Sequence, residues 1–64
     1  MYRLQVYHPG DVGLVHWEDH HNAAEVLKRI PALLEEHLQC ERIVVTFGEA
    51  QLFVVDCKGN STRG

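Results

Sequence analysis

Residues 43–55, IVVTFGEAQLFVV, decide the fold of this chain. Two apolar runs flank the pair Gly48-Glu49, which suits a two-residue β-hairpin loop with glycine at the first central position of a type II′ turn. Phe47 then pairs with Ala50, and regular alternation assigns every other residue to one face. The predicted apolar face comprises Ile43, Val45, Phe47, Ala50, Leu52 and Val54. The opposite face, which includes Val44, Phe53 and Val55, is half apolar.

The N-terminal residues predict a second hairpin. Residues 2–7 alternate as a strand does, and His8-Pro9-Gly10-Asp11 has the signature of a type II turn. This turn places Tyr7 opposite Val12 and predicts a second strand over residues 12–17, although residues 11–13 are also compatible with a longer loop. One face of this hairpin would carry Tyr2, Leu4, Val6, Val15 and Trp17, and the other Arg3, Gln5, Tyr7, Val12, Leu14 and His16.

A helix is predicted between the two hairpins. Asn22 is a good N-cap with Glu25 three residues later, although Asp19 is an alternative start. The predicted apolar stripe consists of Ala23, Leu27, Ile30, Leu34 and Leu38, flanked by Val26 and Leu33. Because Pro31 removes one backbone hydrogen bond while the stripe keeps its phase, we expect a kinked helix or two short helices.

The element order is therefore ββαββ, which predicts an α+β domain over residues 1–57 followed by a flexible polar tail over residues 58–64. We expect a four-stranded, mostly antiparallel sheet with the Pro31-kinked helix on one face. In outline this order resembles the protein G-type β-grasp, which implies the strand order 2-1-4-3 with the first and last strands parallel. The alternative is the order 1-2-3-4 with a right-handed crossover.

The composition of the chain limits its expected partners and location. The chain has 64 residues and a net charge of −3, with its six basic residues scattered, which disfavours nucleic acid as a partner. No apolar run approaches the roughly 18 residues of a membrane span. The N-terminus alternates from its start and has no apolar signal region, so we expect a cytoplasmic location. Cys40 and Cys57 are predicted to face each other as reduced thiols, with a bridge of adjusted geometry as the alternative.

A single helix covers only one face of a sheet, so the half-apolar face is the predicted functional surface. A chain this short gains from extra burial, and we expect this face to bind a protein partner or a second copy. The predicted interface residues are Arg3, Tyr7, Leu14, Arg42, Val44, Phe53 and Val55, with Phe53 and Tyr7 as anchors. This points to a small non-enzymatic protein-binding or self-assembling module without a cofactor, such as an accessory regulator.

Two alternatives come from other residues. A divalent-metal module, with zinc as the first choice, would use ligands from one short segment: His16, Asp19, His20 and His21. A nucleic-acid module would use aromatic and arginine side chains of the half-apolar face. We find no constellation of residues typical of catalysis, so no catalytic residue is predicted.

Overall fold

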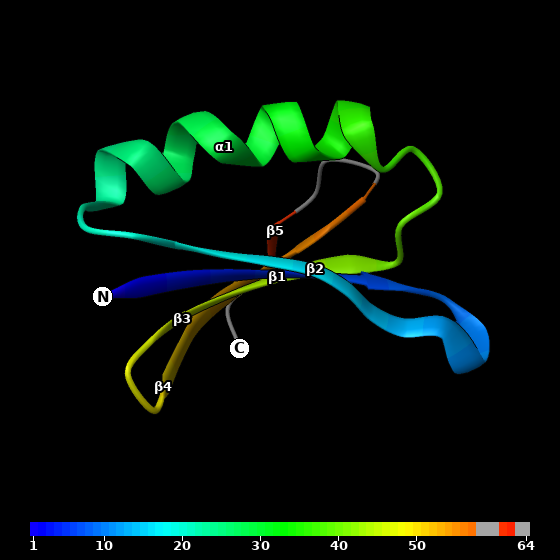
Figure 1. Ribbon diagram of the computed structural model, residues 1–64, viewed down its shortest axis with the longest axis horizontal. Coiled ribbons are helices and arrows are strands. Elements are labelled where there is room, and N and C mark those ends of the chain that lie inside the picture. Colours follow the sequence, from blue (N-terminus) through cyan, green and yellow to red (C-terminus); the bar gives the residue numbers. More distant parts are fainter. Residues whose placement is uncertain (58–60, 63–64) are drawn as a thin grey trace.

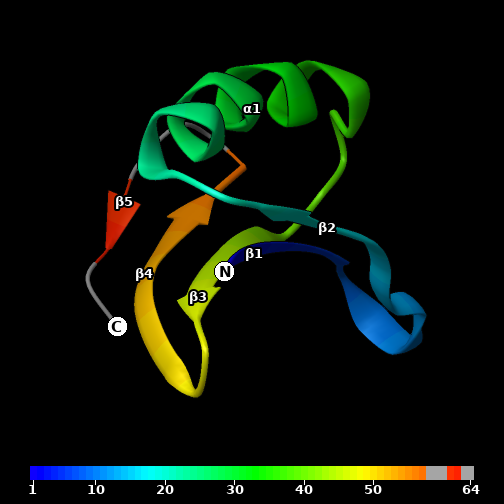
Figure 2. The same ribbon diagram turned by 60° about the vertical axis from the view of Figure 1, so that its left-hand side comes forward.

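The computed structural model describes residues 1–57 and the backbone of residues 61–62. Its elements, in chain order, are β1 (Tyr2–His8), the 3-10 turn η1 (Gly10–Val12), β2 (Gly13–His20), α1 (Ala23–Glu36), β3 (Arg42–Phe47), β4 (Ala50–Asp56) and the short β5 (Ser61–Thr62). The sheet is antiparallel throughout, and α1 lies across one of its faces (Figures 1 and 2). The predicted α+β class and the ββαββ order of residues 1–57 are confirmed, whereas the sheet has a fifth strand, β5, beyond the four predicted.

The strand order is β2-β1-β3-β4-β5, so both predicted orders are wrong. β1 pairs with β3 and not with β4, and the connection through α1 passes over β1 to join two parallel strands, β2 and β3. The β-grasp likeness therefore does not hold. The physical reason is burial: Ile43, Val44 and Val45 are all buried, as suits a strand inside the sheet, whereas β2 carries charged and polar residues that suit an edge.

Each hairpin contains one extra residue that reverses the alternation of its second strand. In the C-terminal hairpin Phe47 pairs with Ala50 as predicted, and Gly48 has the required positive φ of 61°. Between Val45 and Thr46 the register shifts, which leaves Leu52 unpaired as a β-bulge. From that point Phe53 and Val55, not Leu52 and Val54, lie on the side of the helix.

The N-terminal hairpin differs from the prediction in a similar way. The connection is shifted by one residue from the predicted 8–11 to residues 9–12, which include η1, so His8 pairs with Gly13 and Tyr7 with Leu14. A second register shift leaves Val15 unpaired and pairs Val6 with His16. Trp17 therefore lies on the face opposite to the predicted one.

The helix begins as predicted, with Asn22 Oδ1 accepting a hydrogen bond from the Glu25 amide at 2.9 Å. It runs continuously through Pro31, so the two-helix alternative is wrong. Val26 and Leu33 are its most buried residues, whereas Leu27 is 62% exposed. The buried side of the helix is therefore centred on Val26 and Leu33, which were predicted only to flank the stripe, and Leu38 of the predicted stripe is 81% exposed.

The core lies between α1 and the sheet. Its buried residues come from the helix and three strands: Leu4, Val6, Val26, Leu33, Ile43, Val45 and Val55. A disulfide joins Cys40, before β3, to Cys57, after β4, with Cα atoms 5.6 Å apart, which corrects the prediction of reduced thiols. β5 pairs with β4 within the segment predicted as a tail, and the rest of that prediction, residues 58–60 and 63–64, lies outside the described residues.

No helix within the described ranges has the length and apolar character needed to cross a membrane.

Candidate functional site

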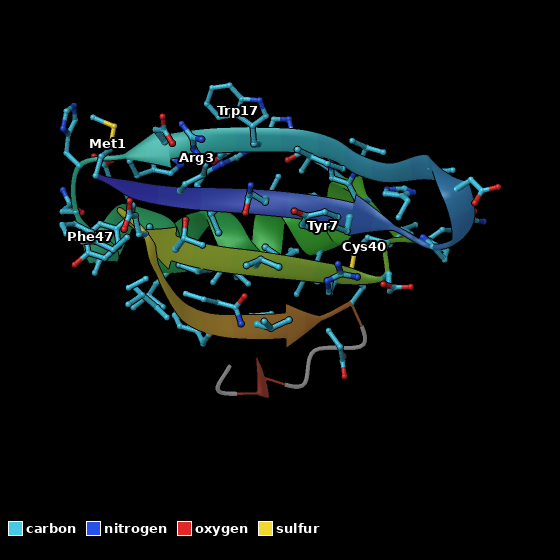
Figure 3. All side chains as sticks on the ribbon, turned by 90° about the horizontal axis from the view of Figure 1, so that it is seen from below. Met1, Arg3, Tyr7, Trp17, Cys40 and Phe47 are labelled. Atoms are coloured by element: carbon cyan, nitrogen blue, oxygen red, sulfur yellow. A yellow bond between two sulfur atoms is a disulfide. The ribbon has the colours of Figure 1, made fainter. Side chains whose placement is uncertain are left out.

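The sheet face turned away from α1 is uncovered within the described part of the chain, and Figure 3 shows it from the outside. Alternation along β1 and the register of its neighbours assign the side chains of this open face. They are Arg3, Gln5, Tyr7, Leu14, Trp17, Asp19, Arg42, Val44, Thr46, Gln51, Val54 and Asp56. Polar and aromatic groups are thus mixed on one surface.

Five of the seven predicted interface residues lie on this face: Arg3, Tyr7, Leu14, Arg42 and Val44. Phe53 and Val55 do not. Both pack with the core beneath α1, because the bulge at Leu52 turns them inward. Trp17, which is 53% exposed, is the large aromatic residue that the sequence prediction missed.

Arg3 holds together one end of the open face. Its Nε and one terminal nitrogen donate to the two carboxylate oxygens of Asp19 at 2.8 and 3.2 Å. Its guanidinium carbon also lies 4.4 Å from the ring centroid of Trp17, within cation–π range. The hydrogen bond and the charge of Arg3 lower the pKa of Asp19, so both groups are charged at neutral pH. The indole is thereby fixed in place by a side chain on the neighbouring strand.

Arg42 has a similar role at the other end. Its guanidinium carbon lies 4.4 Å from the ring centroid of Tyr7, and it forms an ion pair with the adjacent Glu41. Between the two arginine–aromatic pairs, Gln5 and Val44 sit opposite each other on the central strands. Two preordered cation–aromatic pairs therefore flank the middle of the face.

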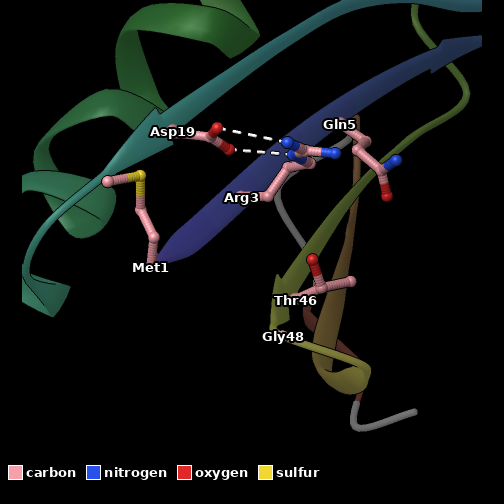
Figure 4. Close-up of a pocket in the computed structure, with 6 residues that line it drawn as sticks. All are labelled: Met1, Arg3, Gln5, Asp19, Thr46 and Gly48. Atoms are coloured by element: carbon pink, nitrogen blue, oxygen red, sulfur yellow. Dashed lines mark hydrogen bonds and ion pairs between the residues drawn. The ribbon is translucent and has the colours of Figure 1, made fainter.

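A hollow of about 480 Å³ lies beside the Arg3 pair, toward the β3–β4 turn (Figure 4). It is lined by Met1, Arg3, Gln5, Asp19, Thr46 and Gly48. Figure 4 shows the dashed Arg3–Asp19 bonds on one side of the hollow and Thr46 on the other. Its lining combines cationic, anionic, amide and hydroxyl groups, so it offers hydrogen-bond donors and acceptors to a polar group from outside.

A separate polar cluster lies on the helix side of β2, centred on Glu18. Arg29 donates two hydrogen bonds to its carboxylate, at 2.7 and 3.1 Å. The rings of His16 and His20 bond the same carboxylate at 2.8 and 2.5 Å. The Arg29 hydrogen bonds are the largest cause that lowers the pKa of Glu18 to about 2. This cluster ties the edge strand to α1, and the sequence prediction missed it because the bulge decides on which side Glu18 lies.

The predicted metal ligands are not brought together. Asp19 is on the open face with Arg3, whereas His16 and His20 point to the helix side and bond Glu18. His21 follows the end of β2 and is exposed. Among residues 1–57, no group of three or more histidine, cysteine, aspartate or glutamate side chains is arranged to hold a metal ion. The alternation of neighbours in β2 thus separates the four residues, which corrects the predicted ligand set.

The Glu18 cluster predicts a stability maximum in mildly acidic solution. The pKa of Glu18 is lowered, so its contribution is present above pH 4.5 and is lost as the pH falls toward about 2. The pKa of His20 is raised by its bond to Glu18, so its contribution is present below pH 6.5 and is lost at higher pH. After allowing for solvent screening, we expect the acid-side loss to be about 1–2 kcal/mol.

Urea unfolding at several pH values measures this dependence, and Glu18→Gln is the matched control. The variant is expected to lose stability near pH 5–6, by about 1–2 kcal/mol, and to show a flatter profile between about pH 2 and 5. If its profile runs parallel to that of the native chain, Glu18 does not govern the acid limb.

Comparison with known proteins found no matching family model, no similar curated protein and no similar solved structure.

Proposed function

We propose that this chain is a small, non-enzymatic protein-binding module that acts through the open sheet face. The observation that carries the proposal is the exposed indole of Trp17, which is held on that face by Arg3. Tryptophan, tyrosine and arginine are the residues that most often dominate binding energy at protein interfaces. Here all three types occur on one face, and they are ordered before any partner arrives.

The apolar part of the same face supports this proposal. Leu14 is 44% exposed, whereas Val44, which pairs with Val54 in the middle of the sheet, is only 7% exposed, so Leu14 and Trp17 supply the accessible apolar area. An apolar centre with polar and charged neighbours is the usual composition of a protein interface. The size of the chain adds a reason, because a 64-residue domain gains stability from any further burial.

Protein is a better match for this face than nucleic acid. Asp19 and Asp56 accompany the two arginines, so the face has no excess of positive charge to neutralise phosphates. The rings of Trp17 and Tyr7 are also already stacked against guanidinium groups, which would compete with stacked bases.

The disulfide is relevant to the compartment in which the chain works. The sequence predicts a cytoplasmic location, where thiols are kept reduced, whereas a disulfide such as Cys40–Cys57 is typical of oxidising compartments. The redox state of these two cysteines in the native host, measured by trapping free thiols at lysis, distinguishes the two locations.

Site-specific photo-crosslinking tests the proposed function. A benzophenone amino acid at Leu14, on the open face, is expected to form adducts with protein, either a host protein or a second copy. The same group at Leu27, exposed on the helix, is the matched control and should form few. Trp17→Glu should remove the Leu14 adducts. Equal yields from both positions, or no protein adduct from Leu14, would contradict the proposal.

A further inference from the structure

We infer that the open face binds a second copy of this chain, and that Trp17 of each copy enters the hollow beside Arg3 of the other. The inference rests on the proposed function and specifies its partner. A two-fold axis between two open faces brings the same residues together from both copies, so one contact between an indole and a hollow implies a second, equivalent contact.

The face contains both halves of such a contact. Trp17 is exposed on β2, and the hollow is lined by residues of the adjacent β1 and of β3, including Gln5 and Thr46. Figure 3 shows the indole beyond the outer edge of β2, with Arg3 beside it on the neighbouring strand. The indole and the hollow are therefore neighbours, on opposite sides of β1. A two-fold axis that runs along β1 between the two copies would place the indole of each copy against the hollow of the other. Arg3, which already stacks on its own Trp17, borders the hollow that receives the indole of the other copy.

The charges of the face suit self-association. One end carries Arg3 with Asp19, and the other carries Arg42 across from Asp56. Because each end contains a cation and an anion, either end of one copy can face either end of the other without a net repulsion between like charges. A strongly charged partner would find no complementary field on this face.

The size of the face is close to that of a stable interface. Viewed edge-on in Figure 1, the sheet extends along the longest axis, so the open face covers the 28 and 19 Å extents of a body of 28 × 22 × 19 Å. One such face is about a sixth of the surface of a block of these dimensions, so its whole accessible area, a sixth of 4382 Å², is about 730 Å², which is the most that a partner could cover. Dimers of standard size bury about 800 Å² per partner.

Sedimentation equilibrium of the native chain, together with its fluorescence, tests the inference. Trp17 is the single tryptophan, so its emission should shift to shorter wavelength as the concentration rises and the dimer forms. Trp17→Glu removes the projecting group, and Thr46→Tyr fills the hollow while leaving Trp17 in place. Each is expected to raise the dimer dissociation constant by about 30-fold or more, the usual effect at an interface hot spot. Leu27→Glu, on the opposite layer, should leave it unchanged.

The outcomes separate the inference from the proposed function. A native chain that stays monomeric at millimolar concentration overturns the inference, while the proposed function stands if Leu14 adducts with another protein depend on Trp17. A dimer that is broken by Trp17→Glu but not by Thr46→Tyr overturns insertion into the hollow. A dimer that only Leu27→Glu disrupts overturns the inference, and the Leu14 crosslinking then decides the proposed function alone. Amide NMR spectra of each variant verify that the monomer is folded.

Discussion

Replacing Cys40 and Cys57 by alanine is expected to lower the free energy of unfolding by about 3 kcal/mol. The disulfide restricts the unfolded chain, and the chain-entropy model gives about 3 kcal/mol for a closed loop of about 15 residues. The two residues are 17 positions apart, and the bond ties the start of β3 to the end of β4. For a domain of this size the loss corresponds to a fall in Tm of about 12–24 °C. It is also a large share of the total stability, about 3–10 kcal/mol, that a chain of 64 residues can have.

Thermal and urea unfolding of the oxidised native chain and of the double alanine variant measure the effect. The native chain in reducing agent is the matched control, since it keeps both sulfur atoms and loses only the bond. It should unfold close to the double variant, and reducing agent should not change the variant itself. Equal stability of the oxidised and reduced native chain would show that the bridge contributes nothing.

Val55→Asp is expected to destabilise the fold by at least about 3 kcal/mol, because it buries a carboxylate without a partner. Val55 is 5% exposed and packs in the core beneath α1. Val54→Asp, one residue earlier, places the same charge on the open face, where water can reach it, and should cost much less. The two variants thus differ only in the side of the sheet that they occupy.

Urea unfolding of the two variants tests the bulge directly. Uninterrupted alternation from the turn would place Val54 beneath the helix and Val55 outside, so it predicts the opposite order of stabilities. Folded Val55→Asp together with unfolded Val54→Asp would therefore show that Leu52 is paired and that the bulge is absent. It would also return Phe53 to the open face as an anchor.

Much of the local structure follows from the sequence. The Gly48-Glu49 turn, the Asn22 cap and the ββαββ order were predictable, because turns and caps depend on a few neighbouring residues with strong backbone preferences. The existence of an uncovered face was predictable as well, since one helix shields only one side of a sheet. Five interface residues were placed on that face by alternation alone.

The sides of β2 and β4 were decided only in the tertiary structure. Each bulge adds one residue to a strand, and the residues around Val15 and Leu52 contain no local pattern that predicts it. A bulge is favoured when the shifted register packs better against the rest of the molecule. At Leu52 the shift sends Phe53 and Val55 into the core. At Val15 it sends Glu18 to Arg29 on the helix and turns Trp17 outward. The sequence by itself thus determined the elements and the presence of a sheet face that the helix does not cover. The strand order and the residues on that face were determined by long-range packing. The reason is that the energy of a strand register depends on contacts between segments that are distant in the sequence.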